Sequence, residues 1–394
     1  MRLITTGFVL ALLIAATIGA SPVQAASPSS AAPVCPGPAS AGTARCHAQV
    51  VVDRSGRPLV TSNVVNGYRA ADLTSAYNLP SPLGSTWIWS NQTVAIVDAY
   101  NDPNAESDLA VYRTTMGLPP CTTANLCFTK VDQNGGTKYP KTNTGWSLEI
   151  SLDLDMASAI CPNCKILLVE ASSNSFANLG AAVDRAAGIG ANVISNSYGG
   201  SEFSGETGSA YDGHFKHPGV AITVSSGDSG YGVEYPAASQ YVTAVGGTTL
   251  NWNGTTRTET AWSGAGSGCS AYEPKPSWQS GIATCANRAV ADVSAVADPN
   301  TGVAVYDTVR YQGQSGWFKV GGTSASSPII AGVYALAGNA GSVNDGSFSY
   351  SHTTQLNDVT SGSNGSCGGS NLCTAGRGWD GPTGNGTPNG SGGF

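Results

Sequence analysis

The chain has 394 residues, 41% of them hydrophobic, which is enough to bury the core of one large α/β domain or of two smaller ones. Only 11% of the residues are charged, and 25 acidic against 18 basic groups give a net charge of −7. This composition excludes wholesale disorder, and the acidic excess argues against a nucleic-acid or anionic-membrane partner.

The N-terminus has the pattern of a secretory signal. Arg2 precedes an apolar run over residues 8–16, which is far shorter than the roughly 20 residues that span a bilayer. Residues 23–25 then provide a site for signal-peptidase cleavage. We expect residues 1–25 to be removed, leaving a mature chain that is secreted, extracellular and free of the membrane. The alternative, an uncleaved membrane anchor, would need a longer apolar run.

Residues 26–65 are rich in Ala, Ser and Pro at first and then carry a short Val-rich run over residues 49–53. This segment is predicted to be a linker or a short N-terminal extension, because it is too small for an independent domain. Residues 66–394 are predicted to form the main domain.

Strand-like and helix-like segments alternate in the main domain. Apolar, β-rich runs occupy residues 94–97, 166–169, 193–195, 220–224 and 241–245, and helix-compatible segments include 148–160 and 177–187. This alternation predicts an α/β fold with a mostly parallel central sheet and helices on both of its faces. In such sheets the ligand sites lie at the carboxyl ends of the strands.

The ten cysteines fall into neighbouring pairs, and an even count in an exported chain favours disulfides. Pairing between neighbours is the least demanding arrangement: Cys35/Cys46, Cys121/Cys127, Cys161/Cys164, Cys269/Cys285 and Cys367/Cys373. The Cys161/Cys164 spacing also occurs in redox motifs, but a structural loop is the favoured interpretation.

Glu149 and Asp153 lie four residues apart near the start of the helix-compatible segment, so they share one helix face. Two close carboxylates repel each other, which raises one pKa and lets the pair share a proton. A solvated acidic helix start is the alternative, but the surrounding residues are apolar. The pattern therefore favours a buried carboxyl pair.

A third carboxylate, Asp228, follows a predicted strand within Ser226-Gly227-Asp228-Ser229-Gly230. A turn would explain an Asp between glycines equally well. A protonated carboxyl at this place, however, would donate a hydrogen bond to an oxyanion.

The sharpest local motif is Gly321-Gly322-Thr323-Ser324-Ala325-Ser326-Ser327-Pro328, which precedes an apolar helix former over residues 329–337. Pro328 fits the first helical turn, so the motif places the Ser324 hydroxyl at a helix N-terminus. A serine nucleophile needs a base. The histidines, at positions 47, 214, 217 and 352, are predicted to be surface residues, which leaves the carboxylates as candidate bases.

Together these segments resemble the sedolisins, the serine-carboxyl peptidases of the subtilisin-like superfamily, from about Gly67 to Pro388. Besides the motifs above, the matching segments are Tyr68, Asp72-Leu73, residues 76–80, residues 235–239, residues 243–248, Arg288 and residues 292–295. The resemblance implies a subtilisin-like fold and a secreted endopeptidase that cleaves polypeptides at acidic pH.

The resemblance also implies a role for each candidate residue. Ser324 would attack the scissile carbonyl, Glu149 would act as general base and then general acid, and Asp153 would orient Glu149. Asp228 would donate a proton to the oxyanion. Asp98, at the end of a predicted strand, is either an additional acid coupled to Glu149 or a turn-capping residue.

The Gly-rich C-terminal segment resembles the calcium-binding loop of the family. By that resemblance one Ca²⁺ would be held by the side chains of Asp358 and Asp380 and by the carbonyl groups of Val359, Gly376 and Gly378. Oxygen-only ligation suits calcium.

Sedolisins are usually made with a large N-terminal prodomain, which residues 26–65 are too short to supply, so how activity is restrained is an open question. The chain is an active monomeric endopeptidase or a catalytically silent extracellular peptide-binding relative. A subtilisin with a histidine base is the mechanistic rival.

Overall fold

The computed structural model describes residue 1 and residues 30–80, 90–282 and 284–394. The predicted signal segment therefore lies outside the described residues, apart from Met1. Within this part of the chain no helix is both long enough and apolar enough to cross a membrane.

The central sheet has eight strands among the described residues, and seven of them form a continuous path in the order β13-β12-β10-β8-β5-β7-β6. The path comprises β13 (Arg257–Ala261), β12 (Thr243–Trp252), β10 (Ala221–Ser225), β8 (Val193–Asn196), β5 (Thr93–Ala99), β7 (Lys165–Ala171) and β6 (Phe128–Asp132), and β16 (Val293–Val296) also pairs with β12. All pairs are parallel except β12 with β13. The predicted parallel sheet is confirmed.

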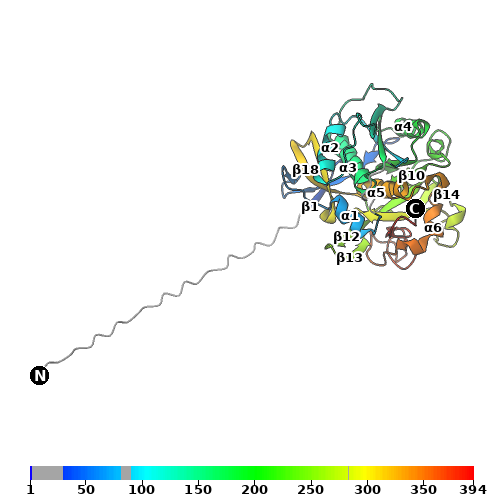
Figure 1. Cartoon of the computed structure of the whole chain (residues 1–394). Helices are drawn as coiled ribbons and strands as arrows, with labels where there is room; N and C mark the ends of the chain where they lie inside the picture. Colours follow the sequence, from blue (N-terminus) through cyan, green and yellow to red (C-terminus); the bar gives the residue numbers. More distant parts are fainter. Residues whose placement is uncertain (2–29, 81–89, 283) are drawn as a thin grey trace.

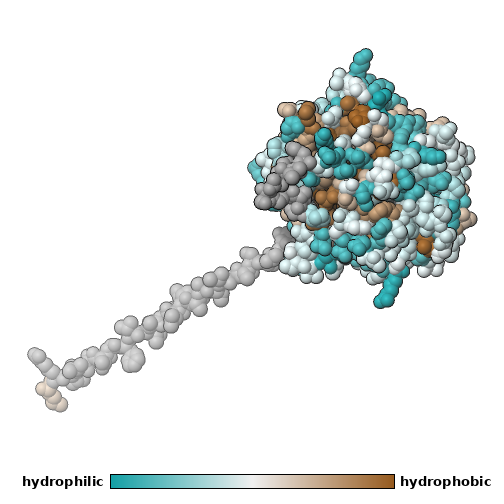
Figure 2. All heavy atoms as spheres, turned by 45° about the vertical axis from the view of Figure 1, so that its right-hand side comes forward, coloured by the Kyte–Doolittle hydropathy of each residue, from teal (hydrophilic) through white to brown (hydrophobic). Residues whose placement is uncertain are grey.

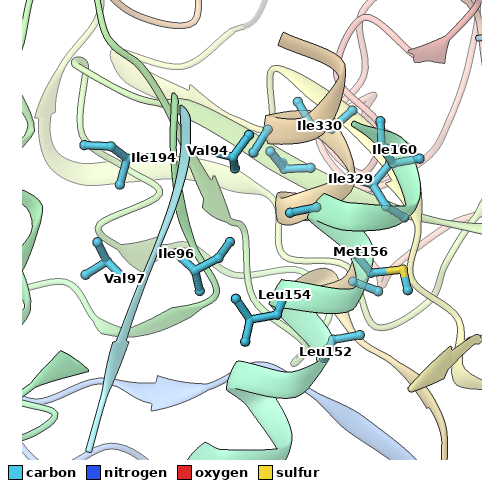
Figure 3. Packing of buried hydrophobic residues seen from close by; sticks show 14 of the residues in the cluster. Val94, Ile96, Val97, Leu152, Leu154, Met156, Ile160, Ile194, Ile329 and Ile330 are labelled. Carbon is cyan, nitrogen blue, oxygen red and sulfur yellow. The ribbon is translucent and has the colours of Figure 1, made fainter. Parts of the chain in front are cut away.

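The described helices are α1 (Ala70–Ala76), α2 (Ala105–Thr115), α3 (Thr144–Ile160), α4 (Phe176–Ile189), α5 (Thr323–Ala337) and α6 (Ser347–Ser351). Helices α3 and α5 pack against each other and against the sheet, and α4 packs on β5, β7 and β8 (Figure 1). Figure 3 shows Val94 and Ile96 of β5 turned toward α3 and α5, while Val97 and Ile194 point away from them. The strands are thus buried on both faces, which explains their nearly continuous apolar sequences.

Residues 30–61 contribute strands to the folded body. Strands β1 (Ser30–Pro33), β3 (Gln49–Val52), β18 (Gln314–Gly321) and β17 (Val303–Tyr311) form one sheet, with β4 (Val60–Thr61) paired to β18. Strand β2 (Arg45–Cys46) joins β9 (Tyr198–Ser201) and β11 (Glu234–Tyr235). The predicted N-terminal extension is therefore packed against the main domain in its described part.

The remaining described strands form two small antiparallel pairs. These pairs are β14 (Gly268–Pro274) with β15 (Asn287–Val290), and β19 (Leu356–Asn357) with β20 (Thr387–Pro388). Trp379 and Phe394 are buried. All five predicted disulfides are formed between neighbours. On the face shown in Figure 2, hydrophobic surface is confined to small separate patches among hydrophilic and neutral residues.

Candidate active site

The candidate residues converge from three places in the fold. Glu149 and Asp153 come from α3, Asp228 follows β10 at the carboxyl end of the sheet, and Ser324 is the second residue of α5. Glu149, Asp153 and Ser324 are fully buried. The structure thus brings together all four residues that the sequence singled out for chemistry.

The position of Ser324 depends on the turn that leads into α5. Gly322 has a φ of 92°, and a methyl group on its Cα would lie 1.9 Å from the carbonyl oxygen of His47, so only glycine fits here. The helix starts at Thr323, six residues before the predicted start at residue 329. The prediction that Pro328 occupies the first turn was therefore wrong, because it is the sixth helical residue.

Pro328 leaves a backbone acceptor free close to the reactive hydroxyl. Proline has no N–H, so it cannot donate to the carbonyl of Ser324, four residues earlier. That carbonyl instead accepts a hydrogen bond from the Ser197 hydroxyl at 3.3 Å. The Ser324 hydroxyl in turn donates to the Ser197 carbonyl at 3.2 Å. Because of the proline, the Ser197 side chain can bond to the first turn of α5 and hold it in place.

The pKa values of both α3 carboxyls are raised, mainly by burial. Burial raises the pKa of Glu149 well above its ordinary value, and the Asp153 charge adds to this rise, whereas the Ser324 hydroxyl and the Ala48 N–H oppose it. Burial also raises the pKa of Asp153, with a further contribution from Asp98. Helix α3 begins at Thr144, so Glu149 lies in its second turn and is not part of a solvated helix start. The buried interpretation is confirmed.

Asp228 has one bonded and one unbonded carboxyl oxygen. Its Oδ1 accepts hydrogen bonds from the backbone N–H and the hydroxyl of Thr323, both at 2.8 Å. Its Oδ2 is buried and has no hydrogen-bond partner among the described residues. Burial raises the pKa of this carboxyl, while His47, Thr323 and Gln49 oppose the rise. A protonated Oδ2 would be free to donate a hydrogen bond to a reacting group.

Ser197 is a site residue that the sequence analysis missed. It follows β8, and its hydroxyl donates to Asp153 Oδ1 at 2.8 Å. Its carbonyl accepts from Ser324, so one residue connects the carboxyl pair to the nucleophile candidate. The only signal in the sequence was its place just after the predicted strand 193–195.

Asp98 lies at the end of β5 and is fully buried, with neither carboxyl oxygen paired among the described residues. Burial raises its pKa well above the ordinary value, and the Glu149 and Glu170 charges raise it further. The electrostatic coupling to Glu149 favours the extra-acid interpretation over a turn cap.

The histidine side chains of the described residues make their contacts away from Ser324. His47 is buried, so the prediction that it lies on the surface was wrong: it is covered by β9 and the segment around Glu234. His214 and His217 pair with Asp184, and His352 stacks on Phe348. In the described part of the chain, no hydrogen bond connects a histidine side chain to Ser324.

The loop predicted to bind a metal holds the carboxyls of Asp358 and Asp380 close to each other. Gly376 N–H donates to Asp380 Oδ2 and Gly378 N–H donates to Asp358 Oδ2, both at 3.0 Å, so one short loop bridges the two carboxyls. Burial raises the pKa of Asp380 to about 7, and the Asp358 charge contributes to the rise. No cluster of three or more His, Cys, Asp or Glu side chains suited to a metal occurs within the described residues. Two carboxylates without a Cys or His beside them would suit calcium rather than zinc.

Comparisons with known proteins agree with this geometry. A family model described as the subtilase family matches residues 132–356. Kumamolisin from Bacillus sp. (strain MN-32) is 30% identical over 358 residues, which cover 82% of this chain and 62% of that protein. Sedolisin from Pseudomonas sp. (strain 101) is 30% identical over 383 residues, which cover 86% of this chain and 63% of that protein.

The chain is also similar in structure to Pseudomonas sedolisin, a serine-carboxyl proteinase, solved in complex with two molecules of pseudo-iodotyrostatin. The TM-score is 0.68 at 28% identity, and the match covers 83% of this chain and 96% of that chain. The chain spans less than two thirds of the length of the curated relatives named above.

Proposed function

Because this chain belongs to the subtilase family and, within that superfamily, to the sedolisins, we propose that it is a serine-carboxyl endopeptidase that hydrolyses polypeptides at acidic pH. The observation that carries the proposal is the convergence on Ser324 of a buried carboxyl pair and of an unpaired, buried Asp228 Oδ2.

The proposed reaction uses these residues in sequence. Ser324 Oγ attacks the scissile carbonyl carbon and Glu149 takes the Ser324 proton, while Asp153, held by Ser197, orients and polarises Glu149. Asp228 donates its proton as a hydrogen bond to the developing oxyanion. Glu149 then gives its proton to the leaving amine, and water hydrolyses the acyl-enzyme by the reverse sequence. The charge of Asp98 adds to the rise in the pKa of Asp153, so Asp98 acts on this carboxyl through space.

The acidic pH preference follows from the direction of the pKa shifts. Burial raises the pKa values of Glu149, Asp153 and Asp228. Asp228 therefore keeps its proton at a pH where exposed carboxyls are ionised, whereas Glu149 and Asp153 share a proton, so that Glu149 is able to accept the one from Ser324. When the pH rises through these pKa values, Asp228 loses the proton that it would donate. We therefore expect the rate to fall as the pH increases toward neutrality and above.

The experiment is hydrolysis of a denatured protein by the purified chain between pH 3 and pH 8, with Ser324→Ala as the matched variant. We expect activity at acidic pH that the variant lacks, because removing a serine nucleophile costs several orders of magnitude in kcat. Equal inertness of both folded proteins would favour a silent peptide-binding relative. A chain with all four histidines replaced should keep its rate, which a histidine base would not allow.

We also propose that the C-terminal loop binds one Ca²⁺ through the side chains of Asp358 and Asp380 and the carbonyl groups of Val359, Gly376 and Gly378. Sedolisins typically bind calcium, and the carboxyls of Asp358 and Asp380 lie at one loop in this chain. Bound calcium would offset their repulsion and stabilise the loop. Chelation of calcium is expected to lower the midpoint of thermal unfolding, and Asp380→Asn should remove that sensitivity. An equal response to chelator in both proteins would contradict the assignment.

We propose that residues 1–25 are a cleaved signal, that residues 66–394 are the peptidase domain, and that the mature protein is an extracellular monomer. Five disulfides agree with export to an oxidising compartment.

A further inference from the structure

The sheet carries two further carboxyls behind the carboxyl pair of α3. Asp98 of β5 and Glu170 of β7 are register partners on neighbouring parallel strands, so their side chains leave the same face of the sheet. Val94 and Ile96 of β5 point toward α3 and α5, and side chains alternate along a strand, so this is the face that α3 covers (Figure 3). Asp98 and Glu170 therefore lie on the same side of the sheet as the catalytic carboxyl pair.

Four carboxyls on this side of the sheet are fully buried, and they form what we call the buried acid group: Asp98, Glu149, Asp153 and Glu170. Each of them has at least one buried oxygen without a hydrogen-bond partner among the described residues. Burial raises the pKa of Asp98 most, and the charges of Glu149 and Glu170 raise it further. A negative charge on one member of the group therefore opposes ionisation of the next.

Glu170 is paired with a cation. Its Oε1 accepts hydrogen bonds from Lys130 Nζ at 2.9 Å and from the Asp102 N–H at 2.8 Å. Lys130 Nζ also donates to Asn101 Oδ1 at 2.7 Å and to the Asp102 carbonyl at 2.6 Å. Three acceptors thus hold the ammonium in place. Burial raises the pKa of Glu170, and the Lys130 charge opposes that rise.

The turn after β5 connects this ion pair to α3. Ser147 Oγ donates to the Asn101 carbonyl at 3.1 Å, and Ser151 Oγ donates to Asp102 Oδ2 at 3.3 Å. Ser151 lies in the sequence between the two catalytic carboxyls. The turn that holds the ammonium is therefore bonded to the same part of α3, so the cation keeps a fixed distance from those carboxyls.

Other titratable side chains approach the buried acid group or its Asp102 neighbour from the elements around them. They are Asp102 from the turn after β5, Asp108 from α2, Lys130 and Asp132 from β6, Tyr139 from the segment after β6, Asp155 from α3 and Tyr198 from β9. Lys130 is the cation that acts on both Asp102 and Glu170. Helix α4 covers the opposite face of the sheet, and its Asp184 and Arg185 are exposed to solvent.

The ammonium lies at the edge of the core. A groove lined by Asn101, Glu106, Phe128, Lys130 and Tyr139 borders it, and Lys130 Nζ lies 4.4 Å from the centre of the Tyr139 ring. The Lys130 side chain is 12% exposed, whereas the carboxyl pair of α3 is fully buried. A substitution at Lys130 therefore changes the charge next to the buried acid group without emptying the core.

We propose that Lys130 and Glu170 are positioning residues for the reaction, and that together they determine how readily the Glu149–Asp153 pair carries the negative charge that a general base needs. The inference rests on the proposed function, since Glu149 accepts the Ser324 proton only when the pair is ionised. Neither Lys130 nor Glu170 contacts the reacting atoms in this assignment.

The two residues act on this charge in opposite directions. The Lys130 ammonium favours a negative charge throughout the buried acid group, because charges act over long distances in an interior of low dielectric constant. Glu170 competes with the other three carboxyls for that charge, and its effect reaches the pair through Asp98. Removing the lysine should therefore make the pair harder to ionise, whereas neutralising Glu170 should make it easier.

The test is the pH dependence of kcat/KM for hydrolysis of a denatured protein between pH 3 and pH 8. The acidic limb is the readout, since it reports ionisation of the base in the free enzyme. We expect Lys130→Met to move this limb upward by about 0.5–1 pH unit and Glu170→Gln to move it downward. Lys130→Arg keeps the charge and should keep the wild-type limb. Lys165→Met, at the exposed start of β7, is the matched control and should also leave the limb in place.

The position of the limb does not depend on the amount of folded enzyme, so partial misfolding of a variant cannot produce these shifts. Each variant has its own predicted direction, so either one decides the question if the other fails to fold. A limb that stays in place or moves the other way in a folded variant overturns the inference, as does an equal shift in Lys165→Met. The proposed function stands in those cases as long as hydrolysis is lost in Ser324→Ala. If the wild type shows no Ser324-dependent hydrolysis, the proposed function fails, and the inference fails with it.

Discussion

At the scale of single residues, the site depends on contacts that cross between elements. Ser197 contacts Asp153 through its hydroxyl and Ser324 through its carbonyl, so it connects α3, β8 and α5. The sequence places Glu149 and Asp153 on one helix face because they are one turn apart. It carries no comparable signal for Ser197, whose importance arises only where three elements meet.

We expect Ser197→Ala to lower kcat about 10- to 100-fold, the usual effect of removing a hydrogen bond to a charged group. The Ser197 hydroxyl lowers the pKa of Asp153, so its loss should also move the acidic limb of the pH–rate profile upward. Ser326→Ala is the control, because that buried hydroxyl donates to the carbonyls of Ala295 and Val296. An unshifted pH profile in Ser197→Ala would contradict the positioning role.

At the scale of elements, the distance between α3 and α5 sets the geometry of catalysis. Gly332 of α5 packs on Ile160 of α3, and a methyl group at Gly332 would lie 2.7 Å from the Ile160 Cβ. Figure 3 shows Ile160 beside Ile329 and Ile330 of α5. Sequence periodicity predicts both helices but not their contact, and it placed the start of α5 too late because Pro328 is tolerated in the second turn.

Gly332→Ala is expected to destabilise the protein by about 1–3 kcal/mol through overpacking. The same substitution should lower kcat, because it moves Ser324 relative to Glu149. The matched control is Gly188→Ala in α4, where no atom lies within 4 Å of the added methyl group. That change should stabilise the protein by about 0.5–1 kcal/mol. Denaturant unfolding and steady-state kinetics measure both effects, and an unchanged Gly332→Ala enzyme would refute the argument.

At the scale of the whole molecule, the chain has few charged residues, and several of them are buried acids. Burial raises the pKa of Asp102 and of Glu170 to about 7 and that of Asp307 to about 8. The folded state therefore holds protons that the unfolded state has already released. Their stabilising contribution is complete below the ordinary values of 3.8 and 4.5 and is lost as the pH rises through 7 to 8. Glu234 has the opposite effect on the free energy of unfolding. Its pKa is lowered to about 2 in the folded state, so its stabilising contribution is lost when the pH falls through that value.

We therefore expect the midpoint of thermal unfolding to be highest at moderately acidic pH and to fall toward neutral and alkaline pH. The measurement is a series of thermal melts in the Ser324→Ala background, which prevents self-digestion. Asp307→Asn should reduce the decline between pH 5 and pH 8, because it removes one of the groups whose pKa burial raises. A midpoint that rises steadily to pH 8 would refute this prediction.

Most helices and strands of this protein, and most of the residues assigned to its chemistry, could be predicted from the sequence. Apolar runs predicted the parallel strands, the spacing of the cysteines favoured the disulfides that the structure contains, and the motifs around Glu149, Asp228 and Ser324 indicated the family. These features are local, so short stretches of chain encode them. Only the folded chain shows that Ser197 joins the site, that His47 is buried and that residues 44–49 pass beside Ser324. Those facts depend on contacts between residues far apart in the sequence, and no local pattern records which strand edge an extended segment will pair with.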